Sequence, residues 1–164
     1  MALSPSSDDA IANDVALLRD NDAVRRILDE VCGLTKMGFA AVARVTDSRW
    51  IACHVIDRIE FGLEAGDELA LKTTICDEIR QSGQAVIIDH VSGEPAWRTH
   101  PIPMLYGFES YASLPIVLDD GSFFGTLCAI DTEPRALRSI ELIALLQGYA
   151  QRIAAIVAAA PRAA

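Results

Sequence analysis

Two apolar runs, SYASLPIVL at 110–118 and FFGTLCAI at 123–130, flank the four residues DDGS at 119–122. Both runs contain the β-branched and aromatic residues that favour strands. The segment between them is short and polar, and Gly121 readily takes the positive φ that a tight turn requires. We therefore predict a β-hairpin here, and the rest of the chain is interpreted outward from it.

A second hairpin is predicted upstream, from the strand-like runs at 39–45 and 50–56 and the short turn at 46–49. Before it, apolar residues recur at helical spacing on both sides of the polar break at 20–22. The chain is therefore predicted to open with two helices followed by a hairpin.

The segment between the hairpins is predicted to hold a short helix over 75–82, which starts after Thr74 and ends at Gly83. An apolar strand at 85–88 follows. The next segment, 89–107, contains several prolines and glycines, which indicates a long structured loop with one helical turn. Long loops in compact domains are commonly functional.

The last predicted helix, over 139–160, has two apolar faces. One apolar face suffices to pack on a sheet, so the second face needs another partner. That partner is either a second copy of the chain or the N-terminal helices. A homodimer interface on this helix is predicted to include Leu142, Leu145, Tyr149 and Ile156.

The length and composition fit one globular domain. The chain has 164 residues, of which 51% are hydrophobic and 23% charged, and a chain of this size can bury a full core. Residues 1–7 are predicted to be a disordered N-terminus, 8–160 the single domain and 161–164 a C-terminal tail.

The charge and the cysteine pattern exclude several kinds of partner. A net charge of −9 without a Lys/Arg cluster disfavours nucleic acid and membrane surfaces. No apolar run approaches the ~20 residues of a spanning helix and no signal-peptide pattern is present, so we expect a cytoplasmic protein. The four cysteines form no CxxC pair and the three histidines lack paired carboxylates, so no metal site is predicted.

Several motifs along the chain occur together in one known family. They are LKTTICDEIRQSG at 71–83, VIIDH at 86–90, HP at 100–101, YGFESY at 106–111, LPI at 114–116 and GTLCAID at 125–131. Together they resemble the GAF domains attached to bacterial sensor histidine kinases and diguanylate cyclases. The resemblance covers residues 23–159, almost the whole chain.

This resemblance implies an α+β fold with a six-stranded antiparallel sheet, helices mainly on one face and a ligand pocket on the other. It also implies a sensory domain rather than an enzyme, one that binds a small molecule or answers to redox state. Such domains usually dimerise through their terminal helices, and the output partner is expected to be a histidine kinase or another signalling protein. The cofactor is not identified, and an empty dimerising module is an alternative.

The candidate ligand-binding residues surround the long loop, the short helix and the strand at 50–56. Trp50 and His54 are taken together because residues four apart in a regular strand share a face. Free backbone N–H groups at the start of the short helix favour a small anionic or polar ligand, although Trp97 and Tyr106 have the alternative role of pinning the loop. The predicted ligand-binding set is Trp50, His54, Thr74, Cys76, Trp97, His100, Tyr106 and Tyr111.

Cys76 is the redox candidate, because the first turn of a helix favours a thiolate. The alternative is a small buried hydrophobic residue. Cys53 and Cys128 fall within predicted strands and are expected to be packing residues. The adjacent Cys53 and His54 are expected to point to opposite faces of their strand, so they cannot act on one atom.

Other members of the family that this chain resembles suggest two alternative functions. Free methionine-(R)-sulfoxide reductases are also stand-alone GAF proteins, and Cys76 falls about where one of their cysteines lies. Their catalytic cysteine in the long loop is missing here, because no Cys occurs in 77–127. Tetrapyrrole-binding GAF domains carry their linking Cys in the segment that is WRTH here, at 97–100, so only non-covalent tetrapyrrole binding stays as an alternative.

Overall fold

A computed structural model describes residues 7–71 and 74–160, and its centre is a six-stranded antiparallel sheet. The strand order is β3-β2-β1-β6-β5-β4, so the two hairpins meet where β1 pairs with β6. The strands are β1 (Phe39–Val45), β2 (Trp50–Asp57), β3 (Glu68–Leu69), β4 (Val86–Ile88), β5 (Ser110–Val117) and β6 (Phe123–Asp131).

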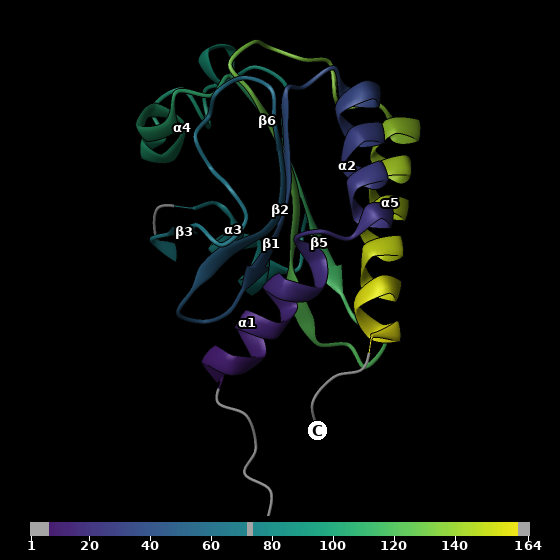
Figure 1. The fold of residues 1–164 in the computed structure, drawn as a ribbon. Helices are drawn as coiled ribbons and strands as arrows, with labels where there is room; N and C mark the ends of the chain where they lie inside the picture. Colours follow the sequence, from purple (N-terminus) through teal and green to yellow (C-terminus); the bar gives the residue numbers. More distant parts are fainter. Residues whose placement is uncertain (1–6, 72–73, 161–164) are drawn as a thin grey trace, which may run out of the picture.

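The helices divide between the two faces of this sheet. Helices α1, α2 and α5 cover one face, here called the helix face, while α3 and α4 lie over the other, here called the loop face (Figure 1). This is the α+β arrangement predicted from the sequence. The bounds are α1 (Ser7–Leu18), α2 (Asp22–Thr35), α3 (Cys76–Ser82), the 3₁₀ turn η2 (Val91–Gly93), α4 (Pro101–Tyr106) and α5 (Ile140–Ala159).

Both predicted hairpins are confirmed. In the β5–β6 hairpin, Gly121 has a φ of 85°, which is the left-handed conformation expected of the turn glycine. The β1–β2 hairpin contains an irregularity that the sequence did not reveal, because its register shifts between Val42 and Ala43 and leaves Cys53 as an extra residue in β2. An extra residue of this kind is a β-bulge, which changes the face toward which later side chains point.

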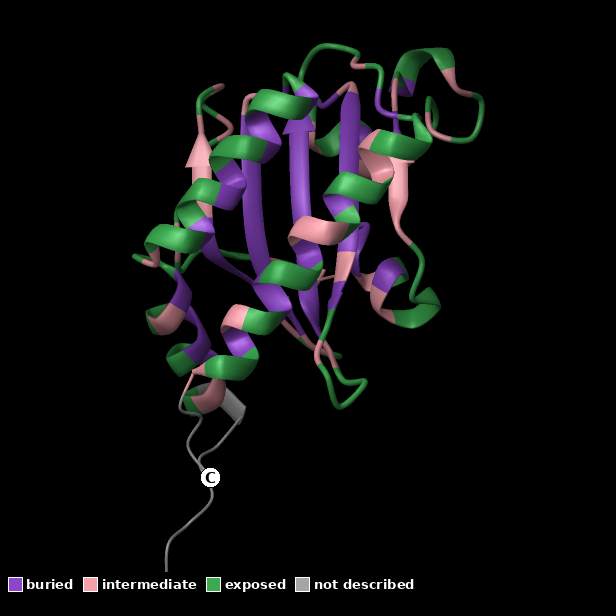
Figure 2. Cartoon of the chain, turned by 90° about the vertical axis from the view of Figure 1, so that its right-hand side faces the viewer, coloured by how far each residue is buried: buried purple, intermediate pink, exposed green. Residues whose placement is uncertain are grey.

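The helix face holds the main core. Buried inner surfaces of α1, α2 and α5 lie against buried strands, while the outer surfaces of these helices are exposed (Figure 2). The helices start at side-chain caps: Asn21 accepts the N–H of Val24, and Ser139 accepts the N–H of Leu142. Large, fully buried side chains fill this core. They include Leu18, Ile27, Leu28, Leu114, Ile116, Phe124, Leu127 and Leu137.

Helix α5 differs from the expectation that no apolar run approaches the length of a membrane-spanning helix. It is 20 residues long and, within the described part of the chain, is the one helix long and apolar enough to cross a membrane by length and composition. It packs on β5, however, and its buried residues belong to the helix-face core. A core helix has the same composition as a spanning one, so this match is weak evidence for a membrane.

The short helix on the loop face starts later than predicted. Helix α3 begins at Cys76, and the Thr74 hydroxyl donates to the carbonyl of Leu71 instead of capping the helix. The hydroxyl is used by the turn that precedes the helix, which is why the capping prediction is wrong. The predicted stop at Gly83 is confirmed, with a φ of 71°.

The predicted terminal segments can be only partly placed. Residues 1–6 and 161–164, predicted to be a disordered N-terminus and a tail, lie outside the described residues. Ser7, which was included in that N-terminus, is the first residue of α1.

Candidate functional site

A narrow pocket lies on the loop face, between the sheet and the segments that cover it. Its volume, measured as the space that the centre of a water molecule can occupy, is about 40 Å³. By that measure it has room for roughly three water molecules. The lining residues are Phe39, Trp50, Phe61, Leu63, Leu69, Thr74, Ile75, Cys76, Ile102, Tyr106, Phe108, Tyr111, Cys128 and Ile130.

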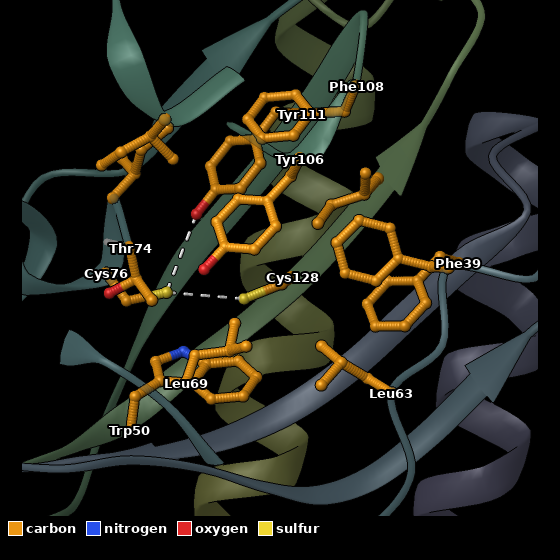
Figure 3. A pocket seen from close by; sticks show the side chains of 14 residues that line it. Phe39, Trp50, Leu63, Leu69, Thr74, Cys76, Tyr106, Phe108, Tyr111 and Cys128 are labelled. Atoms are coloured by element: carbon orange, nitrogen blue, oxygen red, sulfur yellow. Dashed lines mark hydrogen bonds between the residues drawn. The ribbon is translucent and has the colours of Figure 1, made fainter. Parts of the chain in front are cut away.

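The floor of the pocket comes from alternate residues of the central strands. Successive side chains of a strand point to opposite faces, and in β6 this places Cys128 and Ile130 in the pocket while Leu127 and Ala129 enter the helix-face core. The roof comes from the 58–71 segment and from α4, which contributes Tyr106. Figure 3 shows Tyr106 lying over the floor residues Cys76, Cys128 and Tyr111.

The deepest part of the floor is a cluster of thiol and hydroxyl groups. The Sγ atoms of Cys76 and Cys128 are 3.8 Å apart, although the residues are 52 positions apart in sequence. The Thr126 Oγ1 lies 3.2 Å from the Cys76 Sγ and 3.0 Å from the Cys128 Sγ. The Ser113 Oγ is 3.4 Å from the Cys128 Sγ, and the Tyr111 hydroxyl is 3.7 Å from the Cys76 Sγ. All five side chains are buried.

This cluster makes the two thiols chemically unequal. The hydrogen bond from Cys128, together with those from Thr126 and Tyr111 and the nearby Trp50 N–H, lowers the pKa of Cys76 against the opposing effect of burial. The pKa of Cys128 is raised by its hydrogen bond with Cys76 and by burial. One thiolate shared by a hydrogen-bonded pair is the expected result, and the converging donors place the charge on Cys76.

Trp50 contributes a buried donor that is not used. Its side chain is 4% exposed, and its Nε1 is a buried polar atom without a hydrogen-bond partner among the described residues. The Nε1 side of the indole is turned toward Cys76 at the pocket floor (Figure 3) and favours its thiolate form, but too loosely to count as a hydrogen bond. A buried donor without a partner costs about 1–3 kcal/mol, so a group that accepts from it would be stabilised.

The remaining lining is apolar and aromatic. Phe39 and Phe61 pack with ring centroids 5.0 Å apart, and Phe61 and Tyr106 with centroids 5.9 Å apart. The described lining contains no Asp, Glu, Lys, Arg or His, so the Cys76 thiolate is the one charge expected there. The pocket therefore suits a compact molecule with an apolar body and a polar end, and it offers no cation to an anionic ligand.

Five of the eight predicted ligand-binding residues line this pocket: Trp50, Thr74, Cys76, Tyr106 and Tyr111. His54 does not. The bulge at Cys53 turns both Cys53 and His54 toward the helix face, where His54 Nδ1 lies 2.6 Å from the carbonyl oxygen of Leu18 and donates to it. The predictions that Trp50 and His54 share a face, and that Cys53 and His54 do not, are therefore wrong.

The other two predicted residues belong to the roof rather than to the pocket wall. Trp97 packs against the loop-face core, with its ring centroid 5.0 Å from that of His100. His100 caps α4 by accepting the N–H of Ile102 at its Nδ1. This is the alternative role considered for Trp97, namely pinning the loop.

Sequence reasoning missed most of the apolar wall and one half of the thiol pair. Phe61, Leu63 and Leu69 come from a segment for which no structure was predicted, although it contains β3. Cys128 was interpreted as a packing residue. Alternation in β6 was the signal that could have placed Cys128 beside Ile130 on the loop face, but the partner across the pocket was not visible in one strand.

The comparison with protein families agrees with this architecture. A family model, GAF domain, matches residues 21–157. The chain belongs to the GAF family. The match covers both hairpins, the pocket and most of α5. No curated protein sequence matches the chain at a significant level.

Solved GAF structures share the fold at low sequence identity. The GAF domain region of a putative membrane protein from Geobacter sulfurreducens superposes with a TM-score of 0.67 at 16% identity, covering 92% of this chain and 97% of that one. The chromophore-binding domain of Stigmatella aurantiaca bacteriophytochrome gives 0.66 at 15%, with 92% of this chain covered. This GAF chain spans 59% of that domain.

A type II free methionine-R-sulfoxide reductase from Thermoplasma acidophilum is also similar. Its TM-score is 0.63 at 14% identity, with 91% of this chain and 95% of that chain covered. At such identities the likeness shows the fold alone, and both sensory and enzymatic proteins have this GAF fold. The function of this GAF domain therefore has to be argued from its own pocket.

Proposed function

We propose that this GAF domain is a sensory module, not an enzyme, which binds a compact neutral molecule in the loop-face pocket. The observation that carries the proposal is the Trp50 Nε1, a buried donor without a partner that faces a small cavity. A hydrogen-bond acceptor on the ligand would satisfy it. The surrounding aromatic rings would pack against the apolar part of the same molecule.

The pocket chemistry favours a neutral ligand over the anionic one expected from the sequence. The expected anion was to sit on the free N–H groups of a helix starting after Thr74. Helix α3 starts at Cys76 and is only seven residues long, and no Lys, Arg or His side chain lines the described pocket. A thiolate on Cys76 would also repel an anion.

Strands β5 and β6 connect the pocket to α5 and so provide a route for a signal. β5 and β6 form the pocket floor on the loop face and pack against α5 on the helix face. Ligand entry requires Tyr106 and the rest of α4 to move, because the present cavity holds only a few waters. A ligand-induced shift of β5 and β6 would then move α5. The movement of α5 would pass the signal to a histidine kinase or another signalling partner.

Mass spectrometry under native conditions tests the binding proposal. Protein purified from the cells that naturally make it is expected to carry a small additional mass, which is lost on denaturation. A Leu63→Trp variant fills the pocket wall and should lose that mass. Leu34→Trp, on the exposed side of α2, is the matched control and should keep it. An equal added mass on both variants, or none on the wild type, would refute binding at this site.

We further propose that the domain is a homodimer through α5. Of the predicted interface residues, Leu145 is 50% exposed, whereas Leu142, Tyr149 and Ile156 are partly packed against the core. Ile140, which was not predicted, is 89% exposed on the same helix. Light scattering should show a dimer for the wild type and a monomer for Leu145→Glu. Val117→Glu changes a similarly exposed residue at the end of β5 and should stay dimeric.

The two alternatives from related proteins have less support. A tetrapyrrole is a drug-sized ligand that needs a pocket of hundreds of Å³, far more than the present cavity. For sulfoxide reduction, the 89–107 loop lacks the cysteine expected there. We therefore expect no reduction of methionine sulfoxide.

A further inference from the structure

Cys76 and Cys128 form a pair that ligand binding does not explain. They come from α3 and β6, and their Sγ atoms face each other at 3.8 Å on the pocket floor (Figure 3). A disulfide needs about 2 Å between the sulfurs, so a small movement of α3 toward the sheet would close the bond. Cys32 and Cys53 are also buried, but they belong to the helix-face core.

We propose that Cys76 and Cys128 are a peroxide-reactive dithiol that closes to a disulfide across the floor of the pocket. Hydrogen peroxide is the co-reactant. The cavity lined by both sulfurs has room for a molecule of this size. This reaction goes beyond the proposed ligand binding and does not depend on it.

The surroundings assign different roles to the two sulfurs. Peroxide is attacked by a thiolate. The Thr126 and Tyr111 hydroxyls lie 3.2 Å and 3.7 Å from the Cys76 Sγ, with the Trp50 indole near it, so groups that can donate to a thiolate surround Cys76. Cys128 holds its proton more firmly, since its pKa is raised by the hydrogen bond with Cys76 and by burial. Cys76 is therefore the attacking sulfur and Cys128 the resolving one.

The chemistry balances in two steps. The Cys76 thiolate, whose proton has passed to solvent, attacks one peroxide oxygen. The O–O bond breaks, and the departing hydroxide takes a proton back from solvent and leaves as water. Cys76 is then a sulfenic acid. The Cys128 sulfur attacks the Cys76 sulfur, the S–O bond breaks, and hydroxide leaves as water with the Cys128 proton. The two thiols lose two electrons, and hydrogen peroxide is reduced to two waters.

The bond would change the pocket itself. Cys76 is the first residue of α3, and Cys128 lies in the centre of the sheet. A disulfide would tie the start of α3 to β6 and remove the thiolate that now lies near the Trp50 Nε1. The disulfide would thus covalently fix the pocket floor that the ligand is proposed to contact.

Peptide mapping after peroxide treatment tests this proposal without any ligand. Trypsin places the four cysteines on separate peptides, 27–36, 50–58, 73–80 and 99–135. Reduced protein is treated with hydrogen peroxide, alkylated and digested. We expect the intact mass to fall by about 2 Da, and peptide 73–80 to be linked to 99–135. Cys53→Ser is the matched control for a buried cysteine and should give the same cross-link.

Variants separate the two roles. In Cys128→Ser the resolving thiol is absent, so Cys76 should stop at the sulfenic acid and be trapped by dimedone. In Cys76→Ser, Cys128 should react at least tenfold more slowly than Cys76 does in the wild type. If Cys76 and Cys128 were both still free thiols after peroxide treatment of the folded wild type, the proposal would be overturned. A disulfide to Cys32 or Cys53 would overturn it too, and the wild-type map decides even if a variant fails to fold.

Discussion

The two faces of the sheet use the same strands for different purposes. On the helix face, large aliphatic side chains such as Leu114, Ile116 and Leu127 are fully buried and fill the space below α1, α2 and α5. On the loop face, their neighbours Ser113 and Cys128 form a small polar floor under a cavity.

This difference teaches how one β-strand can serve stability and function at once. Leu127 and Cys128 are adjacent, yet one enters a solid core and the other a pocket. Alternation of side chains separates the two tasks by a single residue. Substitutions on the helix face should therefore lower stability, and those on the loop face should alter chemistry while the fold survives.

The largest expected difference in stability is between substitutions of the adjacent residues Leu127 and Cys128. Leu127→Ala should lower the free energy of unfolding by about 2–5 kcal/mol, because a fully buried leucine is replaced by a cavity. Cys128→Ala should cost about 1 kcal/mol, because it removes one sulfur beside an existing cavity. Urea denaturation of both variants measures the difference. Equal losses would break the distinction between the faces.

A smaller difference in stability is expected between Val42→Thr and Thr126→Val, which exchange valine and threonine on opposite faces of the sheet. Val42→Thr puts a hydroxyl into the apolar helix-face core and should cost about 1–3 kcal/mol. Thr126→Val removes a hydroxyl from the loop face and should cost about 1 kcal/mol, since only contacts to sulfur are lost. Denaturation curves of the two variants provide the comparison, which would fail if Thr126→Val proved the costlier change.

A third expected effect is a dependence of stability on pH. Hydrogen bonds, first that of Cys128, lower the pKa of Cys76 to about 6, whereas an unfolded thiol titrates near 8.5. The unfolded chain thus binds more protons between these values, so the free energy of unfolding should rise with pH across this window. The gain is lost as pH falls through about 6. The raised pKa of Cys128 acts in the opposite direction only above about 8.5.

Urea denaturation at pH 6 and pH 8 measures this dependence. The wild type should gain more stability between the two values than Cys76→Ser, in which no thiol titrates at position 76. A thiolate absorbance at 240 nm that appears in the wild type and is absent from the variant would be the direct optical sign. Identical pH profiles for the two proteins would show that Cys76 stays a thiol.

Much of the fold could be predicted because its determinants are local. Apolar runs with β-branched and aromatic residues predicted β5 and β6, and Gly121 predicted their turn. The caps Asn21 and Ser139 mark helix starts for the same reason, since each bonds a backbone N–H within three residues. The family motifs then implied the strand pairing that local patterns leave open.

The site was less predictable because it depends on pairings between distant segments. The bulge at Cys53 exists only in the register of β1 against β2, so the sequence of β2 alone placed His54 on the wrong face. The thiol pair joins Cys76 to Cys128, which no local pattern connects. The wall residues Phe61 and Leu63 lie in 58–67, which forms neither helix nor strand, so no regular periodicity identifies them.

The indole N–H resonance of Trp50 reports most directly on the central claim, that the loop face is the binding face. The chain has two tryptophans, so a Trp97→Phe variant assigns the ¹H–¹⁵N signal of Trp50. Benzamide is a compact aromatic probe with a neutral acceptor, and benzoate is its anionic counterpart. Because the Trp50 donor is unpaired, the account predicts that its signal moves downfield with millimolar benzamide and much less with benzoate. A signal that stays in place with both probes, or that moves equally with both, would contradict it.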